Sequence, residues 1–334
     1  MTGFCAQAMI SWLAVSMNRV LNIPGARFNQ QSTGFYSRPA PFIEFRASLW
    51  SNTLLHADND RDMRLQSYFD RIGYAGTARP SFLTLCDVLR AHICTVPFEN
   101  IDVQLGRALT TAPKDAYAKI VDGRRGGWCY EQNGLFGWAL TEMGFDVTRV
   151  AAAVLRHERG NSANADHLCL LTRCPESAQT WLVDVGFGGG MIRPIELSEG
   201  DHEQAPFRLG LRRVDGNAWR FWEDLGDGEF SYDFAAEPGD ETALSKKCNF
   251  LQMDPKSGFV LNLVVQLRTP NRHLSLRGRV LQVGTVNGIE TEVLTSAKEL
   301  QATLIDIFDL DVPEARALWP RIVSRHEALF SKTP

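Results

Sequence analysis

Residues 125–133 read Arg125-Gly126-Gly127-Trp128-Cys129-Tyr130-Glu131-Gln132-Asn133, so a cysteine stands where a glycine-rich turn enters an amphipathic helix. The two glycines let the backbone turn sharply and leave the sulfur accessible. The free N–H groups and the positive dipole end of a helix favour thiolate over thiol. The stretch therefore predicts a nucleophile at Cys129. Most cysteines are small buried apolar residues, so the prediction needs support from the rest of the chain.

A histidine and an aspartate downstream supply that support. Two short apolar runs flank a polar turn; His167 opens the first run and Asp184 lies near the end of the second. Such runs predict two antiparallel strands. A tight turn centred between Pro175 and Glu176 would place His167 directly opposite Asp184, with both side chains on one face. Without the cysteine, the same pattern would indicate a satisfied core histidine beside a strand-end aspartate.

Together, Cys129, His167 and Asp184 form a nucleophile, a base and an orienting acid. The histidine takes the thiol proton to give a thiolate–imidazolium pair, and the carboxylate holds the ring in the required tautomer. The order Cys, His, Asp is shared by transglutaminases, papain-like hydrolases and acyl transferases. The three residues therefore predict a class of mechanism rather than one reaction.

Three segments in this order resemble the signature segments of the arylamine N-acetyltransferase family. They are residues 96–102 (Val-Pro-Phe-Glu-Asn-Ile-Asp), residues 125–133 and residues 184–188 (Asp-Val-Gly-Phe-Gly). The resemblance covers the chain from about residue 63 to the C-terminus and weakens after about residue 194. Two positions depart from the family pattern: Asp166 stands where threonine is common, and residues 252–255 (Gln-Met-Asp-Pro) replace Ser-Thr-His-Pro.

The resemblance implies a ping-pong reaction. Acetyl-CoA, the co-substrate, would acetylate Cys129, and an arylamine, arylhydrazine or N-hydroxyarylamine would then take the acetyl group. By position, Phe187 and the flanking Gly186 and Gly188 would bind substrate.

The resemblance also implies a buried ion pair between Arg125 and Glu99 behind the cysteine. Without it, Phe187 would be interpreted as a core or loop residue and Arg125 as a solvated loop charge.

Composition limits the remaining possibilities. The 334 residues are 44% hydrophobic and 22% charged, with a net charge of −4, which is typical of an enzyme with two or three domains. There is no basic stripe with interleaved aromatics, so no nucleic-acid partner is expected. Seven cysteines without paired CxxC spacing argue against a disulfide framework or a metal site and favour the cytoplasm.

The predicted fold class is α+β: a helical bundle (62–144) carrying the nucleophile, a β-barrel (145–255) carrying the histidine and aspartate in a papain/transglutaminase-like site, and an α/β lid (256–334). The apolar periodicity places helices at 65–72, 81–93, 113–122, 129–143, 297–308 and 312–329. Short apolar runs place strands at 147–154, 167–172, 181–185, 218–224, 260–267, 273–276 and 279–283.

The first 61 residues lie outside the resemblance and are expected to be either a disordered extension or residues upstream of the native start. Their apolar run, Ala8–Met17, is too short to span a bilayer, and no Lys or Arg precedes it, so no membrane partner is expected.

Other functions stay open. A thiol hydrolase, an amide synthase or a transglutaminase-like acyl exchanger could use the same triad. A non-catalytic relative could bind small aromatic compounds. The acceptor amine, the acyl group and the oligomeric state do not follow from the sequence.

Overall fold

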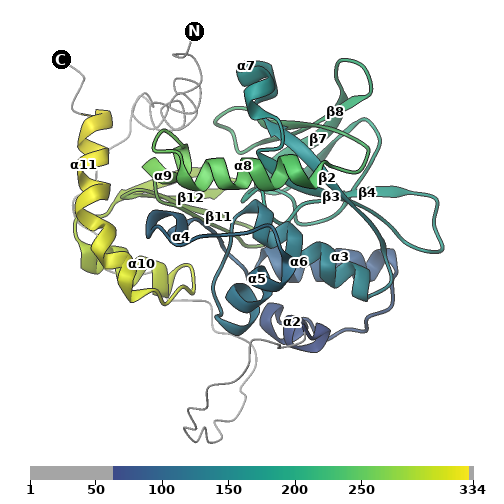
Figure 1. Cartoon of the computed structure of the whole chain (residues 1–334), viewed down its shortest axis with the longest axis horizontal. Helices are drawn as coiled ribbons and strands as arrows, with labels where there is room; N and C mark the ends of the chain where they lie inside the picture. The colour runs from purple at the N-terminus through teal and green to yellow at the C-terminus, as the bar shows by residue number, and fades with distance from the viewer. Residues whose placement is uncertain (1–62, 331–334) are drawn as a thin grey trace, which may run out of the picture.

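The structure is a computed structural model that describes residues 63–330, and its fold is α+β. The predictions for the first 61 residues lie outside this range. The first helices of the described chain lie mainly in the lower half of the molecule in Figure 1. They are α2 (Leu65–Ile72), α3 (Phe82–Ile93), α4 (Ile101–Gln104), α5 (Pro113–Tyr117), a π-helical turn (Ala118–Asp122) and α6 (Cys129–Glu142).

Local signals fix the ends of these helices. The Ser81 hydroxyl accepts a hydrogen bond from the Thr84 backbone and caps α3. Gly73 ends α2 in the left-handed region at φ 71°, where glycine carries no steric cost. Pro113 occupies the first turn of α5. The predicted helices of this part are therefore confirmed.

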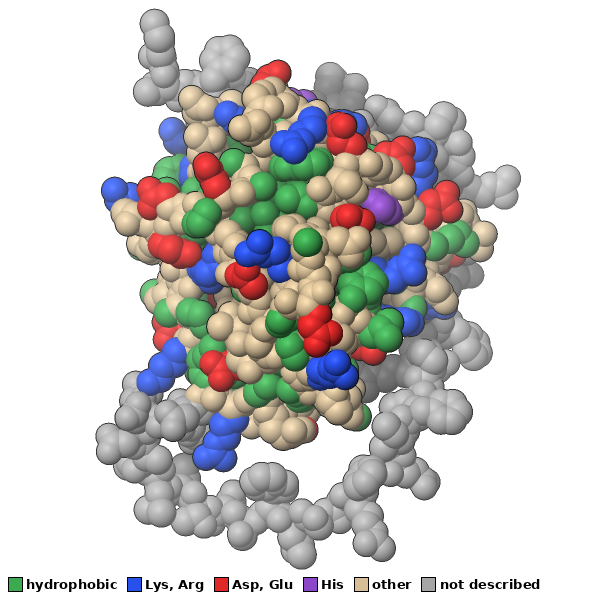
Figure 2. Space-filling model, turned by 90° about the vertical axis from the view of Figure 1, so that its right-hand side faces the viewer, with side chains coloured by type: hydrophobic (Ala, Val, Ile, Leu, Met, Phe, Trp, Pro, Cys, Tyr) green, Lys and Arg blue, Asp and Glu red, His purple; other side chains and the backbone are tan. Residues whose placement is uncertain are grey.

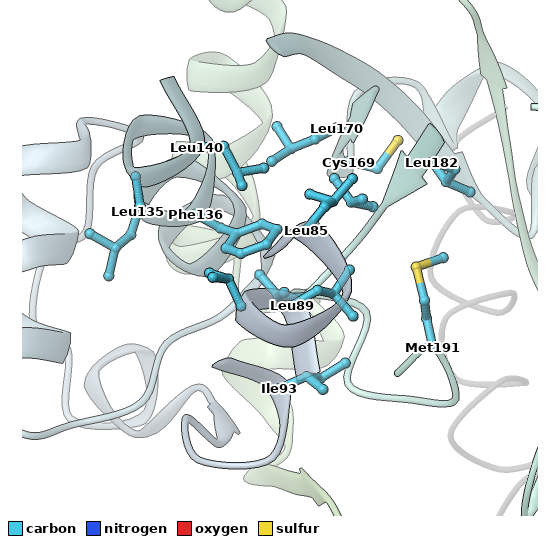
Figure 3. Packing of buried hydrophobic residues seen from close by; sticks show 14 of the residues in the cluster. Leu85, Leu89, Ile93, Leu135, Phe136, Leu140, Cys169, Leu170, Leu182 and Met191 are labelled. Carbon is cyan, nitrogen blue, oxygen red and sulfur yellow. The ribbon is translucent and has the colours of Figure 1, made fainter. Parts of the chain in front are cut away.

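The core joins the helices to the first sheet. Side chains of α3 and α6 face one another and meet residues of β3 and β4, as Figure 3 shows. Leu89 and Phe136 are fully buried in this cluster, together with Leu170 from the sheet. The helix that begins at Cys129 is thus fixed directly against the strand that begins at His167.

That sheet has eight antiparallel strands in the order β5-β4-β3-β2-β9-β8-β7-β6. Its two ends, β5 and β6, are edges, so the predicted barrel is an open sheet. The strands are β2 (Asp146–Val154), β3 (His167–Arg173), β4 (Thr180–Val183), β5 (Ile195–Glu196), β6 (Gly200–Gln204), β7 (Phe207–Arg213), β8 (Ala218–Asp224) and β9 (Phe230–Ala235).

The predicted register of the β3–β4 hairpin was wrong by two residues. Leu171 pairs with Leu182, so continuing the register places Cys169, not His167, opposite Asp184. The connection spans residues 174–179 and is longer on its C-terminal side than the tight turn we expected. A shift of two keeps each side chain on its face, so His167 and Asp184 remain diagonal neighbours.

Further helices connect the strands: α7 (Arg156–Arg159) and a 3₁₀ turn (Gly160–Ala163) lie between β2 and β3, and α8 (Glu241–Met253) and α9 (Gly258–Leu261) follow β9. The sequence did not predict α8. The polar stretch before it supplies Asp240, whose carboxylate accepts hydrogen bonds from Thr242 and Ala243 and caps the helix. The strand predicted over residues 260–267 is also corrected, since α9 ends at Leu261 and the strand β10 begins at Val264.

A second sheet has five antiparallel strands in the order β1-β10-β11-β12-β13. They are β1 (Phe98–Glu99), β10 (Val264–Arg268), β11 (His273–Arg277), β12 (Val280–Thr285) and β13 (Gly288–Val293). The helices α10 (Ala297–Asp306) and α11 (Trp319–Phe330), with a 3₁₀ turn (Pro313–Leu318), share an apolar cluster with this sheet. The two-residue strand β1 comes from the helical part, so the nucleophile's neighbourhood is hydrogen-bonded to the last third of the chain. The domain boundaries at 62, 145 and 256 stay predictions.

Acidic and basic side chains are intermixed on the face in Figure 2, so the net charge of −4 is not gathered there. Within residues 63–330, no helix is both long enough and apolar enough to cross a membrane.

Candidate active site

Cys129 is the first residue of α6, and its side chain is almost fully buried. The preceding turn requires glycine: a Cβ on Gly126 would lie 2.2 Å from the Pro97 carbonyl oxygen. Trp128 precedes the helix in an extended conformation, and its backbone N–H donates to the Glu131 carboxylate at 3.2 Å. The turn and this hydrogen bond together fix the position of the sulfur.

Burial raises the pKa of the Cys129 thiol well above its usual range, and the charge of Asp184 adds to the effect. A hydrogen bond from the Leu168 backbone acts in the opposite direction without reversing it. An isolated thiolate is therefore costly at this position, and ionisation needs a positive partner nearby.

His167 and Asp184 are both 2% exposed, and the His167 Nε2 lies 2.6 Å from an Asp184 carboxylate oxygen. The other carboxylate oxygen accepts from the Asn133 amide at 2.8 Å and from the Gly186 backbone at 2.9 Å. Burial alone would raise the pKa of Asp184, but the charge of His167 and these hydrogen bonds hold it below its usual value. The carboxylate is thus ionised and fully bonded.

Asn133 joins the helix to both strands, and the sequence did not single it out. Its amide also donates to the Leu168 carbonyl at 2.6 Å, while its side-chain oxygen accepts from the Val185 backbone at 3.0 Å. Asn133 lies four residues after Cys129, one turn along the same face of α6. This i, i+4 spacing from Cys129 is the sequence signal that could have identified Asn133 as a site residue.

Cys129 and His167 line one cavity of about 220 Å³ between the two sheets. Its floor is the inner face of the second sheet, where Gln266, Ser275 and Gln282 form a cross-strand row. The cavity is therefore built by all three predicted parts of the chain.

Aromatic rings form the wall beside His167. Phe187 lies 5.2 Å from the imidazole and stacks on Phe230 at 4.7 Å. Tyr232 packs against both rings, 4.8 Å from the imidazole and 4.9 Å from Phe187. A planar apolar group entering the cavity would meet this wall next to the histidine.

The glycines around Phe187 have separate roles. Gly186 lines the cavity, and a Cβ there would lie 2.7 Å from the Cys129 Cα, so only glycine fits. Gly188 has φ 81°, and its carbonyl accepts a hydrogen bond from His273 at 2.7 Å. Its backbone is thereby tied to the second sheet.

Behind the cysteine lies a cluster of five charged side chains. Arg125 lies 2.7 Å from the Glu99 carboxylate, which is fully buried, and 3.3 Å from Asp102. Lys119 lies 2.9 Å from Glu131 and 3.0 Å from Asp102. The expected pair is therefore part of a larger network of two buried cations and three carboxylates, and the half-exposed Arg107 lies 3.2 Å from Asp102 at its edge.

The residues that depart from the family pattern have partners of their own. Asp166 lines the cavity and forms an ion pair with the partly buried Arg159 at 2.6 Å. Gln252 on α8 exchanges two hydrogen bonds with the Leu109 backbone, at 2.7 and 2.8 Å. Among the described residues, no three His, Cys, Asp or Glu side chains gather as metal ligands.

Comparisons with known proteins support the family that the signature segments resemble. A family model described as N-acetyltransferase matches residues 81–317. The arylamine N-acetyltransferase of Mycolicibacterium smegmatis is 35% identical over 257 residues, which cover 75% of this chain and 93% of that protein. The pineal gland isozyme NAT-10 of Gallus gallus is 32% identical, over 74% of this chain and 94% of that protein.

Solved structures agree with the sequence matches. The arylamine N-acetyltransferase from M. tuberculosis superposes with a TM-score of 0.70 at 32% identity, over 78% of this chain and 99% of that one. The Mycobacterium marinum enzyme in complex with CoA gives 0.71 at 30% identity, over 80% of this chain and 99% of that one. With a buried cysteine and a histidine–aspartate pair on one cavity, and relatives matching over most of its length, the chain belongs to the arylamine N-acetyltransferase family.

Proposed function

We propose that this protein transfers the acetyl group of acetyl-CoA to arylamines, arylhydrazines or N-hydroxyarylamines by a ping-pong mechanism through acetyl-Cys129. The observation that carries the proposal is the single cavity lined by Cys129 and His167, with His167 held at 2.6 Å by Asp184. A buried thiol, an imidazole and an ionised carboxylate supply the groups that thiol acyl transfer needs.

In the first half-reaction, His167 takes the proton of Cys129. Because the His167 Nε2 bonds to Asp184, the neutral ring carries its proton there and Nδ1 accepts the thiol proton. The imidazolium then stabilises the thiolate, which burial would otherwise disfavour.

The thiolate next attacks the thioester carbonyl carbon. The tetrahedral oxyanion is stabilised by the backbone N–H groups at the start of α6, those of Cys129 and Tyr130, whereas those of Glu131 and Gln132 already donate to the Trp128 carbonyl. The C–S bond to CoA breaks, and CoA leaves with the proton held by His167. Acetyl-Cys129 and a neutral histidine remain.

The second half-reaction repeats these steps with an amine. An arylamine is weakly basic, so it enters neutral and nucleophilic. Its nitrogen attacks the acetyl carbon, His167 takes the N–H proton, and the Cys129 thiolate leaves to re-form the thiolate–imidazolium pair.

The cavity fits this substrate class. Its volume of about 220 Å³ is below the roughly 300–1,000 Å³ of pockets that enclose whole drug-sized ligands. The thioester end of acetyl-CoA, or a single arene, fits inside, while the nucleotide part of CoA stays outside. Phe187 and the glycines at 186 and 188 form the acceptor side, and the Arg125–Glu99 pair supports the nucleophile from behind.

A cytoplasmic location is part of the proposal, because the nucleophile needs a reducing environment. The six cysteines within residues 63–330 are all free thiols. The division into a bundle, a sheet domain and a lid also stays a proposal.

The experiment is incubation with acetyl-CoA alone, followed by peptide mass mapping. We expect one acetyl group on Cys129, discharged on adding an arylamine. Cys129→Ser abolishes labelling, whereas Cys86→Ser, a change at a more exposed thiol, leaves it intact. Discharge by water at the same rate would support a hydrolase, and absence of labelling would refute acetyl transfer.

A further inference from the structure

Glu223 is a buried carboxyl in the acceptor cavity that the mechanism above does not use. It lines the cavity with Cys129 and His167 and is only 6% exposed. On β8 it follows Phe221 along the inner face, and across the sheet these two residues pair with Phe230 and Tyr232. Glu223 and Phe230 therefore line the cavity side by side, with the aromatic pair Phe221 and Tyr232 next to them on the same face.

One carboxylate oxygen has an assigned partner. It accepts a hydrogen bond from the Gly190 backbone at 2.7 Å, three residues after Phe187. The carboxyl also packs closely against Gly189, where a Cβ would overlap it. A glutamine has the same shape and can accept the same bond, so it would hold this loop equally well. The carboxyl of Glu223 differs from glutamine in that it can ionise.

We propose that Glu223 determines acceptor specificity: when its carboxyl loses a proton, kcat/KM falls for arylamines whose ring carries an anionic substituent. The inference rests on the proposed function, because it concerns the second substrate of that reaction. In this buried wall, two negative charges are poorly screened and repel one another strongly.

Glu223 titrates in a pH range in which the enzyme can be assayed. Burial raises the pKa of Glu223 to about 8, although the Gly190 hydrogen bond and Arg268 oppose the rise. The proton is thus largely retained at neutral pH and lost at mildly alkaline pH.

Other charged or titratable groups act on Glu223 from neighbouring elements. They are Asp184, Asp227, Tyr232, Arg268 and Arg277. Arg268 is bound to the Gln204 and Ala205 carbonyls, which hold its guanidinium in place. Asp184 is bonded to His167 and stays ionised above pH 7. Unlike Asp184, Glu223 has a pKa that is raised into the working range.

The test compares two acceptors of nearly equal shape: 4-aminobenzoate and its neutral methyl ester. Both amines stay uncharged, and the benzoate carboxylate stays ionised, from about pH 6.5 to 9.5. We expect the ratio of kcat/KM, ester over acid, to rise roughly tenfold across this range in the wild-type enzyme. In Glu223→Gln the ratio should stay near its low-pH value.

Asp224→Asn is the matched control, because Asp224 is the next residue on β8, points to the opposite face and bonds to the loop at Gly226. This variant should keep the wild-type rise. A flat wild-type ratio, or an equal rise in Glu223→Gln, overturns the proposal. If Glu223→Gln does not fold, the wild-type profile with its Asp224→Asn control still decides, since a flat ratio refutes it and a midpoint near pH 8 supports it.

Acetylation of Cys129 by acetyl-CoA alone is measured in parallel. If the enzyme is not acetylated, the proposed function has failed. If it is acetylated and both acceptors discharge it with a constant ratio, only the role of Glu223 has failed.

Discussion

The two sides of the cavity are held in place by different forces. Behind Cys129, five charged side chains, including Arg125 and Lys119, are bound to one another with little access to solvent. Beside His167, rings such as Phe187 and Tyr232 pack at 4.7–5.9 Å, and the buried charge in contact with the imidazole is Asp184. The nucleophile is thus backed by a charge cluster, whereas the base is held by aromatic packing together with one carboxylate.

This difference has an energetic consequence. Buried charges are stable only while every partner is present, so the loss of one leaves another without compensation. Aromatic packing is a sum of many small contacts, and its loss is graded. We therefore expect substitutions on the Cys129 side to have all-or-none effects and substitutions on the His167 side to have modest effects. Asp184 is the exception on the His167 side.

The largest effect on activity is expected from a substitution of Asp184. Asp184→Asn keeps the shape but lets the His167 ring adopt the wrong tautomer, which should lower kcat/KM by about 10³- to 10⁴-fold. Steady-state acetylation of an arylamine measures this. Asp233→Asn, on the outer face of β9 where it pairs with Arg220, is the control and should change activity less than tenfold. Comparable losses in both variants would argue for a general effect on folding.

The next effect tests the charged side. Arg125→Met should lower the free energy of unfolding by about 3–5 kcal/mol, because Glu99 is left buried beside other carboxylates. Adding Glu99→Gln should recover part of this loss. Among the five buried side chains, the single variant leaves one cation against three carboxylates, whereas the double variant leaves one against two. Urea unfolding measures both, and a double variant less stable than the single one would contradict the network.

The third effect tests the aromatic side. Phe187→Leu removes the stacking on Phe230 and the edge contact with His167 and should cost about 0.5–1.5 kcal/mol beyond the lost apolar area. We expect the KM for arylamines to rise several-fold while the rate of Cys129 acetylation changes little. Stopped-flow single turnover separates the two steps, and an equal slowing of both would assign Phe187 to the first half-reaction as well.

The smallest effect is a pH dependence confined to the charged side. Burial raises the pKa of Glu131 to about 7, although Lys119 opposes the rise. The folded state therefore binds this proton more tightly than the unfolded state, where the pKa is about 4.3. Its contribution to stability is complete below the unfolded pKa and declines as pH rises towards 7. In Glu131→Gln, unfolding midpoints from pH 5 to 7 should fall less steeply than in the wild type, and an unchanged slope would refute this.

The sequence predicted what is local. The start of α3 at Ser81 and the end of α2 at Gly73 depend on neighbouring residues, and both were located correctly. The hairpin register depends on how the turn is built and was missed by two residues. The diagonal contact between His167 and Asp184 survived because strand parity, unlike register, can be read from alternation.

What the sequence could not predict arises from distant segments. The helix α8 buries only four of its thirteen residues, so its apolar pattern is weak. Lys119 and Glu131 join the Arg125–Glu99 pair only because the turn after α5 folds under α6. Contacts between segments that are distant in the chain leave no local pattern in the sequence.

The strand β1 shows how late this catalyst is completed. Phe98 forms a bridge to Gly127 in the turn before Cys129 and pairs with Gln266, while the Asn100 side chain bonds to the Val264 backbone at 2.8 Å. Phe98 and Gln266, like Asn100 and Val264, lie more than 160 residues apart along the chain, so closing the loop between them carries a large entropic cost. During synthesis, the ribosome has released the thiol and the imidazole long before it releases the strand that secures them. A chain stalled before residue 264 would therefore carry every reacting group and still lack a finished catalyst.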